Sequence, residues 1–149
     1  MSTRISAFIL AAGEGRRLRP ATLSRAKALV PFCGVPLLEL TAAALSSLPI
    51  DNMVVNCCYQ ADRVSEFCAR LARRYNWDLQ VSQEHQLLNH GGGLRKGYKL
   101  IPEAEHILVH NVDVIIDFDL EKLIDAHLQR EAAVTVLLIP GKGPQSVSL

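Results

Sequence analysis

The 149-residue sequence has little net charge and no long hydrophobic run. A formal net charge of +1 argues against a general nucleic-acid binder, because such proteins carry a large surplus of positive charge. No apolar stretch approaches the ~20 residues that a membrane-spanning helix needs. The sequence therefore predicts a protein whose partners are neither nucleic acid nor membrane.

Cysteine is scarce as well, and none of the cysteines forms a C-x-x-C pair. There are four of them: Cys33, Cys57, Cys58 and Cys68. The apolar run at residues 6–12 is too short for the core of a secretory leader, and no cleavage pattern follows it. We therefore expect reduced thiols in a cytoplasmic protein, rather than disulfides or a zinc site.

Short apolar segments are abundant, and they alternate between two periodicities. Near-continuous apolar runs predict buried strands at residues 5–11, 53–57, 77–81, 107–111 and 133–139. Helical spacing predicts helices at residues 37–45, 61–75, 90–100 and 120–129, the last of them capped by Asp119. The alternation predicts an α/β protein with a mostly parallel sheet in a three-layer α/β/α sandwich. We expect one domain over residues 1–140, followed by a tail at 141–149.

The most informative stretch is residues 10–31, a basic loop that follows the first predicted strand. It turns on Gly13 and Gly15, and one acid, Glu14, stands against its cations. Those cations are Arg16, Arg17, Arg19, Arg25 and Lys27. Glycine lets backbone N–H groups approach phosphate oxygens, while Arg16 can fork onto phosphate and Lys27 can supply a point charge. The loop therefore predicts a polyanionic ligand, with a nucleoside triphosphate as the working hypothesis.

Two further features are expected at the same edge of the sheet. The glycines 91–93 follow the third predicted strand, and Asp113 follows the fourth. Ligands of open α/β sheets bind beyond the carboxyl ends of the strands, and a carboxylate there can hold Mg²⁺. Taken singly, each feature also has a plain structural explanation, as a tight turn, a flexible connector or a turn aspartate. Their coincidence at one edge favours a nucleotide site.

Two familiar glycine loops do not match. The sequence has no G-x-x-x-x-G-K-[ST]. The dinucleotide pattern G-x-G-x-x-G fails where Leu18 replaces the third glycine, and the second strand ends near Asn56 without the acid that binds ribose. A dinucleotide-dependent oxidoreductase is therefore disfavoured.

The pattern Gly13-x-Gly15-x-x-Leu18-x-Pro20-x-Thr22, followed by Lys27, Leu29 and Pro31, resembles the signature of the sugar-1-phosphate nucleotidyltransferases, also called NDP-sugar pyrophosphorylases. The segments at residues 34–39, 88–93 and 111–113 are similar to later motifs of that family. Its N-acetylmuramate-1-phosphate uridylyltransferase and mannose-1-phosphate guanylyltransferase branches look nearest, and the sequence does not choose between them.

The resemblance implies a Rossmann-like fold and a Mg²⁺-dependent reaction of a nucleoside triphosphate with a sugar 1-phosphate, giving NDP-sugar and pyrophosphate. By position, Leu10, Ala11, Ala12, Gly13, Gly15, Arg16, Lys27 and Gly92 would bind the nucleotide. Arg16, Lys27 and Asp113 would be catalytic, and Asp113 would bind Mg²⁺.

Some positions depart from the family pattern. Ala26 stands where a proline usually precedes the signature lysine, and Val112 replaces the glycine of N-G-D. The family's catalytic domain normally continues past residue 139 and supplies part of the sugar pocket and a second acidic ligand. The alternative function is therefore a non-catalytic nucleotide-binding or regulatory module that lacks the sugar-binding half. An exposed edge at the last predicted strand also predicts a homo-oligomer.

Overall fold

The computed structural model describes residues 3–138, and its contacts divide the chain into two compact units, Met1–Ile116 and Asp117–Leu149. The first unit carries the sheet and every residue predicted to bind nucleotide or metal. The second carries helix α4 (Leu120–Gln129), where the Asp119 carboxylate accepts a hydrogen bond from the Glu121 N–H at 3.1 Å, as the capping prediction requires. No helix among the described residues is both long and apolar enough to cross a membrane.

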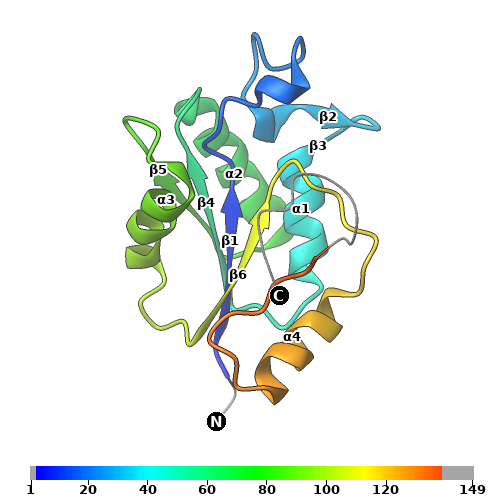
Figure 1. The fold of residues 1–149 in the computed structure, drawn as a ribbon. Coiled ribbons are helices and arrows are strands. Elements are labelled where there is room, and N and C mark those ends of the chain that lie inside the picture. Colours follow the sequence, from blue (N-terminus) through cyan, green and yellow to red (C-terminus); the bar gives the residue numbers. More distant parts are fainter. Residues whose placement is uncertain (1–2, 139–149) are drawn as a thin grey trace. The chain divides into compact units, whose positions relative to one another are not determined.

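The central sheet has four parallel strands in the order β5-β4-β1-β6 (Figure 1). The strands are β1 (Ile5–Leu10), β4 (Asn52–Cys57), β5 (Leu79–Gln83) and β6 (His106–Asn111). From β1 the chain builds outward through β4 to β5, then returns past β1 to form β6. The strand order therefore reverses between β1 and β6, and such a reversal is where open α/β sheets bind ligands.

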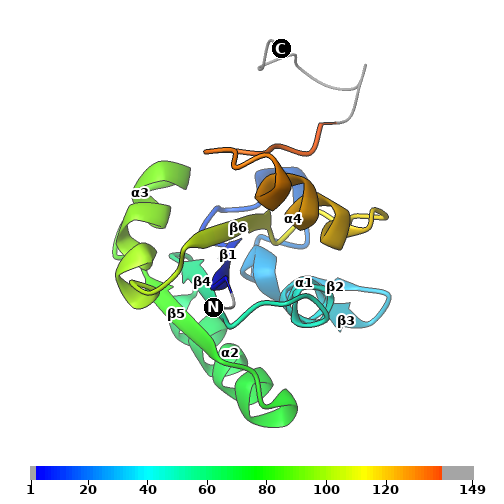
Figure 2. The same cartoon turned by 90° about the horizontal axis from the view of Figure 1, so that it is seen from below.

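Helices cover both faces of this sheet. Figure 2 shows α1 (Leu37–Ser46) and α2 (Ala61–Tyr75) on one face and α3 (Asn89–Gly97), which continues as a 3₁₀ turn at Tyr98–Leu100, on the other. The predicted three-layer α/β/α architecture is confirmed, and it is Rossmann-like with a parallel sheet.

Strand alternation sorts the core into two layers. Phe8 and Val54 are partners in register, are fully buried, and pack with Leu10 and Ile101 beneath α3. Alternation sends their neighbours Ile9 and Val55 to the α1–α2 side, where they are equally buried. Each large apolar side chain buried in this way contributes about 1.5–3 kcal/mol, so the apolar strands hold the site at the strand ends in place.

A small hairpin that the sequence did not predict leads into α1. It pairs β2 (Pro31–Phe32) with β3 (Val35–Pro36) in antiparallel fashion. Its two turn residues have positive φ, 49° at Cys33 and 85° at Gly34, as the favoured two-residue hairpin turn requires. Pro36 ends the hairpin and directly precedes α1.

Two strand predictions need correction. The predicted strand at 77–81 is observed at Leu79–Gln83, because the Trp77 N–H bonds the Ala72 carbonyl at 3.1 Å and so belongs to the end of α2. The predicted strand at 133–139 is wrong over its described part, since residues 133–138 form neither helix nor strand. A strand needs a paired ladder, and apolar composition alone does not supply one; Val134 is 77% exposed. Residue 139 and the predicted tail at 141–149 lie outside the described residues, and the one-domain boundary stays a prediction.

Candidate nucleotide-binding site

Lys27 and Asp113 meet at the switch point of the sheet. Lys27 comes from the loop after β1 and Asp113 from the turn after β6, and the Lys27 Nζ lies 3.3 Å from the Asp113 Oδ1. Both side chains are largely covered, with 10% and 17% of their surface exposed. Gly13 lies beside the lysine end of this pair, because a Cβ at Gly13 would sit 3.7 Å from the Lys27 Nζ. The structure thus brings three predicted site residues together.

Gly15 makes the turn that carries the loop back to Lys27. Its φ is +65°, a left-handed conformation that glycine adopts without strain. A Cβ there would also lie 2.9 Å from the Lys27 Cβ and 2.9 Å from the Thr22 Cγ2, so no other residue fits. The Gly15 carbonyl accepts hydrogen bonds from the Thr22 hydroxyl at 2.8 Å and the Leu18 N–H at 2.9 Å. The glycine, leucine and threonine of the signature therefore build one closed turn.

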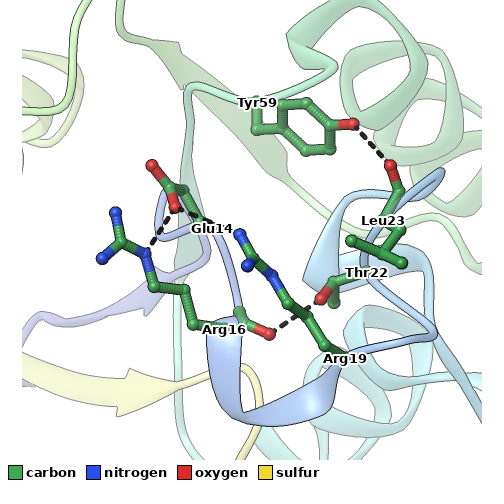
Figure 3. Close-up of polar contacts among 7 residues, drawn as sticks. Glu14, Arg16, Arg19, Thr22, Leu23 and Tyr59 are labelled. Atoms are coloured by element: carbon green, nitrogen blue, oxygen red, sulfur yellow. Dashed lines mark hydrogen bonds and ion pairs between the residues drawn. The ribbon is translucent and has the colours of Figure 1, made fainter.

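Arg16 lies at the outside of this turn (Figure 3). Its Nε donates to Glu14 Oε2 at 2.8 Å, and Arg19 Nη2 lies 4.0 Å from the same oxygen. The hydrogen bond and the charge of Arg16 lower the pKa of Glu14, and Glu14 in turn raises the pKa of Arg16. With 76% of its side chain exposed, Arg16 does not join Lys27 in this structure.

A buried polar network fixes the start of the loop. The Asn56 Oδ1, at the end of β4, accepts the Ala11 N–H at 2.7 Å. The Asn56 Nδ2 donates to Glu84 Oε1 at 2.8 Å, and the other Glu84 oxygen accepts the Leu88 N–H at 3.0 Å. Gly93 packs against this pair, since a Cβ there would lie 2.6 Å from the Asn56 Nδ2. Sequence reasoning missed the network; a polar residue closing an apolar strand was its one visible sign.

A cavity of about 110 Å³ opens between the loop and the start of α3. Its lining consists of Leu10, Ala12, Gly13, Lys27, Asn56, Leu87, Asn89 and His90. Four residues predicted to bind nucleotide therefore share one cavity. The predicted contribution of Gly92 is less direct: Asn89 and His90 line the cavity, and the space beside Gly92 is taken by Leu88, 2.9 Å from a Cβ placed there.

A larger cavity of about 440 Å³ lies between α1 and α2, and it contains none of the predicted site residues. It is lined by Glu39, Phe67, Arg70, Leu71, Arg73 and Arg74. Arg70 lies over the Phe67 ring at 5.3 Å and Arg74 pairs with Glu39 at 3.6 Å, so two of its arginines contact the helix surface. Size does not make this cavity the nucleotide site, because its lining comes from α1 and α2 and includes no residue of the strands or of the loops that follow them.

The donor set fits a magnesium ion that is shared with phosphates. Among residues 3–138, no three His, Cys, Asp or Glu side chains converge to cage a metal. Mg²⁺ is commonly held by one or two carboxylates together with substrate phosphates, and Asp113 supplies one such carboxylate. Val112, which replaces the glycine of N-G-D next to Asp113, is fully buried, so its side chain belongs to the core. Its carbonyl accepts a hydrogen bond from the Thr41 hydroxyl at 3.4 Å.

A parallel sheet with a basic loop that turns on glycines, a largely covered carboxylate and a cavity at its switch point defines an α/β protein of the Rossmann-like type. Residues 6–146 match the family model described as Nucleotidyl transferase, so the chain belongs to the nucleotidyl transferase family. The family prediction is confirmed.

The chain is similar to two mannose-1-phosphate guanylyltransferases. The chain is 30% identical over 141 residues to the mannose-1-phosphate guanylyltransferase catalytic subunit beta of Xenopus tropicalis, covering 94% of this chain and 39% of that protein. It is 30% identical over 146 residues to the mannose-1-phosphate guanylyltransferase of Mycobacterium tuberculosis, covering 96% and 39%. The chain thus spans about 39% of the length of these curated relatives.

Solved structures show the same fold. HddC of Yersinia pseudotuberculosis, complexed with GMP-PN, matches with a TM-score of 0.71 and 26% identity over 83% of this chain and 54% of that one. The CTP:phosphocholine cytidylyltransferase LicC of Streptococcus pneumoniae matches with a TM-score of 0.56 and 27% identity over 74% and 45%.

Proposed function

We propose that the chain binds the triphosphate of a nucleoside triphosphate and serves transfer of a nucleoside monophosphate to a sugar 1-phosphate, releasing NDP-sugar and pyrophosphate. The observation that carries this proposal is the Lys27–Asp113 pair, which sits beside Gly13 at the switch point of the sheet. Proteins use a cation and a metal-binding carboxylate in such a position to handle phosphates.

Burial makes these two charges effective. An ammonium that is 90% covered faces less screening by water than the exposed arginines of the loop, so its attraction to phosphate is stronger. Asp113 would hold Mg²⁺, which when bound would neutralise charge on the phosphates. The backbone of Leu10–Gly13 and Gly15 would position the phosphates, and Lys27 would stabilise the charge that develops as the bond to pyrophosphate breaks.

The first substrates to test are GTP and mannose 1-phosphate, because the relatives are mannose-1-phosphate guanylyltransferases. A uridine nucleotide is the next choice, as the uridylyltransferase branch shares the glycine-rich segment. We further propose that the protein is cytoplasmic and forms a homo-oligomer. The strand at 133–139 no longer supplies the edge for such pairing, but β5 and β6 are the outer strands of the sheet among the described residues. Cell fractionation and light scattering test the two proposals.

The deciding experiment measures pyrophosphate release with Mg²⁺, a sugar 1-phosphate and each of GTP, UTP, CTP, ATP and dTTP. Lys27→Met and Asp113→Asn should each lower the rate by about 10²–10³-fold, the usual cost of removing a charge aimed at the reacting groups. Lys122→Met is the matched control, because Lys122 also pairs with an aspartate, at 3.4 Å, but on an exposed surface. Binding of Mg·NTP without turnover would select the non-catalytic module, and absence of binding by all five nucleotides would overturn the proposal.

A further inference from the structure

The side chain of Gln60 holds the later part of the basic loop at residues 10–31, just before Lys27. Its side-chain Oε1 accepts the Ala26 N–H at 3.2 Å, and its Nε2 donates to the Ser24 carbonyl at 2.9 Å. One amide thus bonds a donor and an acceptor of the backbone immediately before Lys27. Beside it the Tyr59 hydroxyl donates to the Leu23 carbonyl at 3.3 Å (Figure 3).

Gln60 is poorly suited to its own helix. It stands at the N-cap of α2, where a short polar side chain in an extended conformation normally accepts a helix N–H. Gln60 makes no such bond and instead has φ +51° and ψ +41°, a left-handed conformation that costs a residue with a Cβ free energy. Local helix chemistry therefore explains neither its identity nor its conformation, whereas its two bonds to the loop account for both.

The two hydrogen bonds of Gln60, called the clamp from here on, hold the backbone directly before Lys27. Ala26 is 2% exposed and directly precedes Lys27. The side chain of Lys27 then passes Gly15 and Gly13 and ends at Asp113. The Asn56–Ala11 hydrogen bond fixes only the start of the loop. The Gln60 bonds fix the backbone at its later part, near Lys27. Lysine has a flexible four-carbon stem, so fixing its backbone removes much of the freedom that phosphate binding would otherwise have to restrict.

We propose that Gln60 is a positioning residue that presets Lys27 for the triphosphate through the backbone of Ser24 and Ala26. The role rests on the proposed nucleotide binding. It differs from a purely structural role in one measurable way. Gln60→Gly removes the clamp and also relieves the left-handed strain, so affinity for nucleotide should fall while thermal stability does not.

The test compares Mg·GTP affinity by calorimetry with Tm by thermal unfolding. Gln60→Gly should bind about tenfold more weakly than wild type, because nucleotide binding must then order the loop. Its Tm should stay level or rise, because relief of the left-handed strain offsets the two lost hydrogen bonds. In a Lys27→Met background the same change should have no effect on affinity, because the residue it positions is gone. Unchanged affinity in Gln60→Gly, or a loss that accompanies a lower Tm and persists in the Lys27→Met background, would overturn the role.

Asn76→Gly is the matched control. Asn76 ends the same helix with φ +54°, and glycine there relieves the same kind of strain away from the loop. It should raise Tm and leave Mg·GTP affinity unchanged.

Failure of the proposed function would be visible separately. If the wild-type chain binds none of the five nucleotides, the nucleotide role fails, and the clamp is judged by hydrogen exchange. The Ala26 amide should then exchange at least tenfold faster in Gln60→Gly than in wild type, and equal rates would reject the clamp itself.

Discussion

Lys27 and Arg16 carry the same charge but lie in different surroundings. Lys27 is 8% exposed and paired with Asp113, whereas the Arg16 side chain is 76% exposed and paired with Glu14 on the loop surface. Surface pairs contribute little and are screened by salt. For the proposed phosphate binding, the covered lysine therefore suits the central electrostatic role better than the exposed Arg16 does.

His110 gives a prediction at the residue scale. It lies on β6, is 8% exposed, and its Nδ1 is 2.8 Å from the Asn111 carbonyl. Burial lowers its pKa below the ordinary value of 6.5, since the charged ring is poorly solvated there. The unfolded chain then binds more protons than the folded one, so stability is present above about pH 6.5 and falls as pH drops below it.

Chemical denaturation at pH 5, 6, 7 and 8 checks the His110 prediction. The free energy of unfolding of the wild type should fall below pH 6.5, and in His110→Gln this fall should be smaller. Above pH 6.5 the plots of free energy of unfolding against pH should run parallel for the two proteins. Curves that stay parallel down to pH 5 would contradict the assignment of this slope to His110.

Helix α3 shows how an element can be shaped by what it packs against. It contains several glycines, which weaken a helix because they lose more backbone entropy than alanine. Two of them pack against residues of other elements at distances that leave no room for a side chain: Gly93 against Asn56 and Glu84, and Gly97 against Phe8 and Val54. The helix thus gives up intrinsic stability in order to lie close to the sheet.

Substitution of the first and of the last glycine of α3 by alanine should change stability in different ways. A Cβ at Gly97 would lie 2.8 Å from the Phe8 Cζ, so Gly97→Ala should lower the free energy of unfolding by about 1–3 kcal/mol through overpacking. A Cβ at Gly91 would meet no atom within 4 Å, so Gly91→Ala should be neutral or stabilise by up to about 1 kcal/mol. Urea unfolding of both variants measures the difference, and equal effects would contradict this packing of α3.

At the scale of the whole molecule, the thiols report on folding. Cys33 is exposed on the hairpin, whereas Cys57 and Cys68 are buried, which raises the pKa of Cys57 to about 11 and that of Cys68 to about 12. Thiolates are the reactive species, so a thiol reagent at pH 8 should modify Cys33 quickly and leave Cys57 and Cys68 intact.

Mass spectrometry of labelled peptides, with and without urea, checks this order of reactivity. Cys57 and Cys68 should react together, over the same urea range in which helical signal is lost, because both lie in the layer between the sheet and α2. Labelling of either one in native buffer at the rate of Cys33 would contradict the packing.

The sequence by itself determined the strands, the helices and the place of the signature loop, because these depend on short-range patterns. Helix α2 begins and ends where its apolar spacing predicts, and Asp119 caps α4. The loop of residues 10–31 was identified from glycines and cations that are neighbours in the chain. The pattern at 77–81 placed one strand two residues too early. The pattern at 133–138 predicted a strand that does not form, because apolar composition cannot tell whether a partner strand is present.

The tertiary structure alone decided which residues meet. Lys27 and Asp113 are 86 positions apart, Ala26 and Gln60 are 34 apart, and Asn56 and Glu84 are 28 apart. Each contact depends on the strand order β5-β4-β1-β6 and on register, which local periodicity does not encode. The sequence could therefore indicate a phosphate-binding loop, while the ion pair at its centre and the amides that hold its two ends follow from how the strands are arranged.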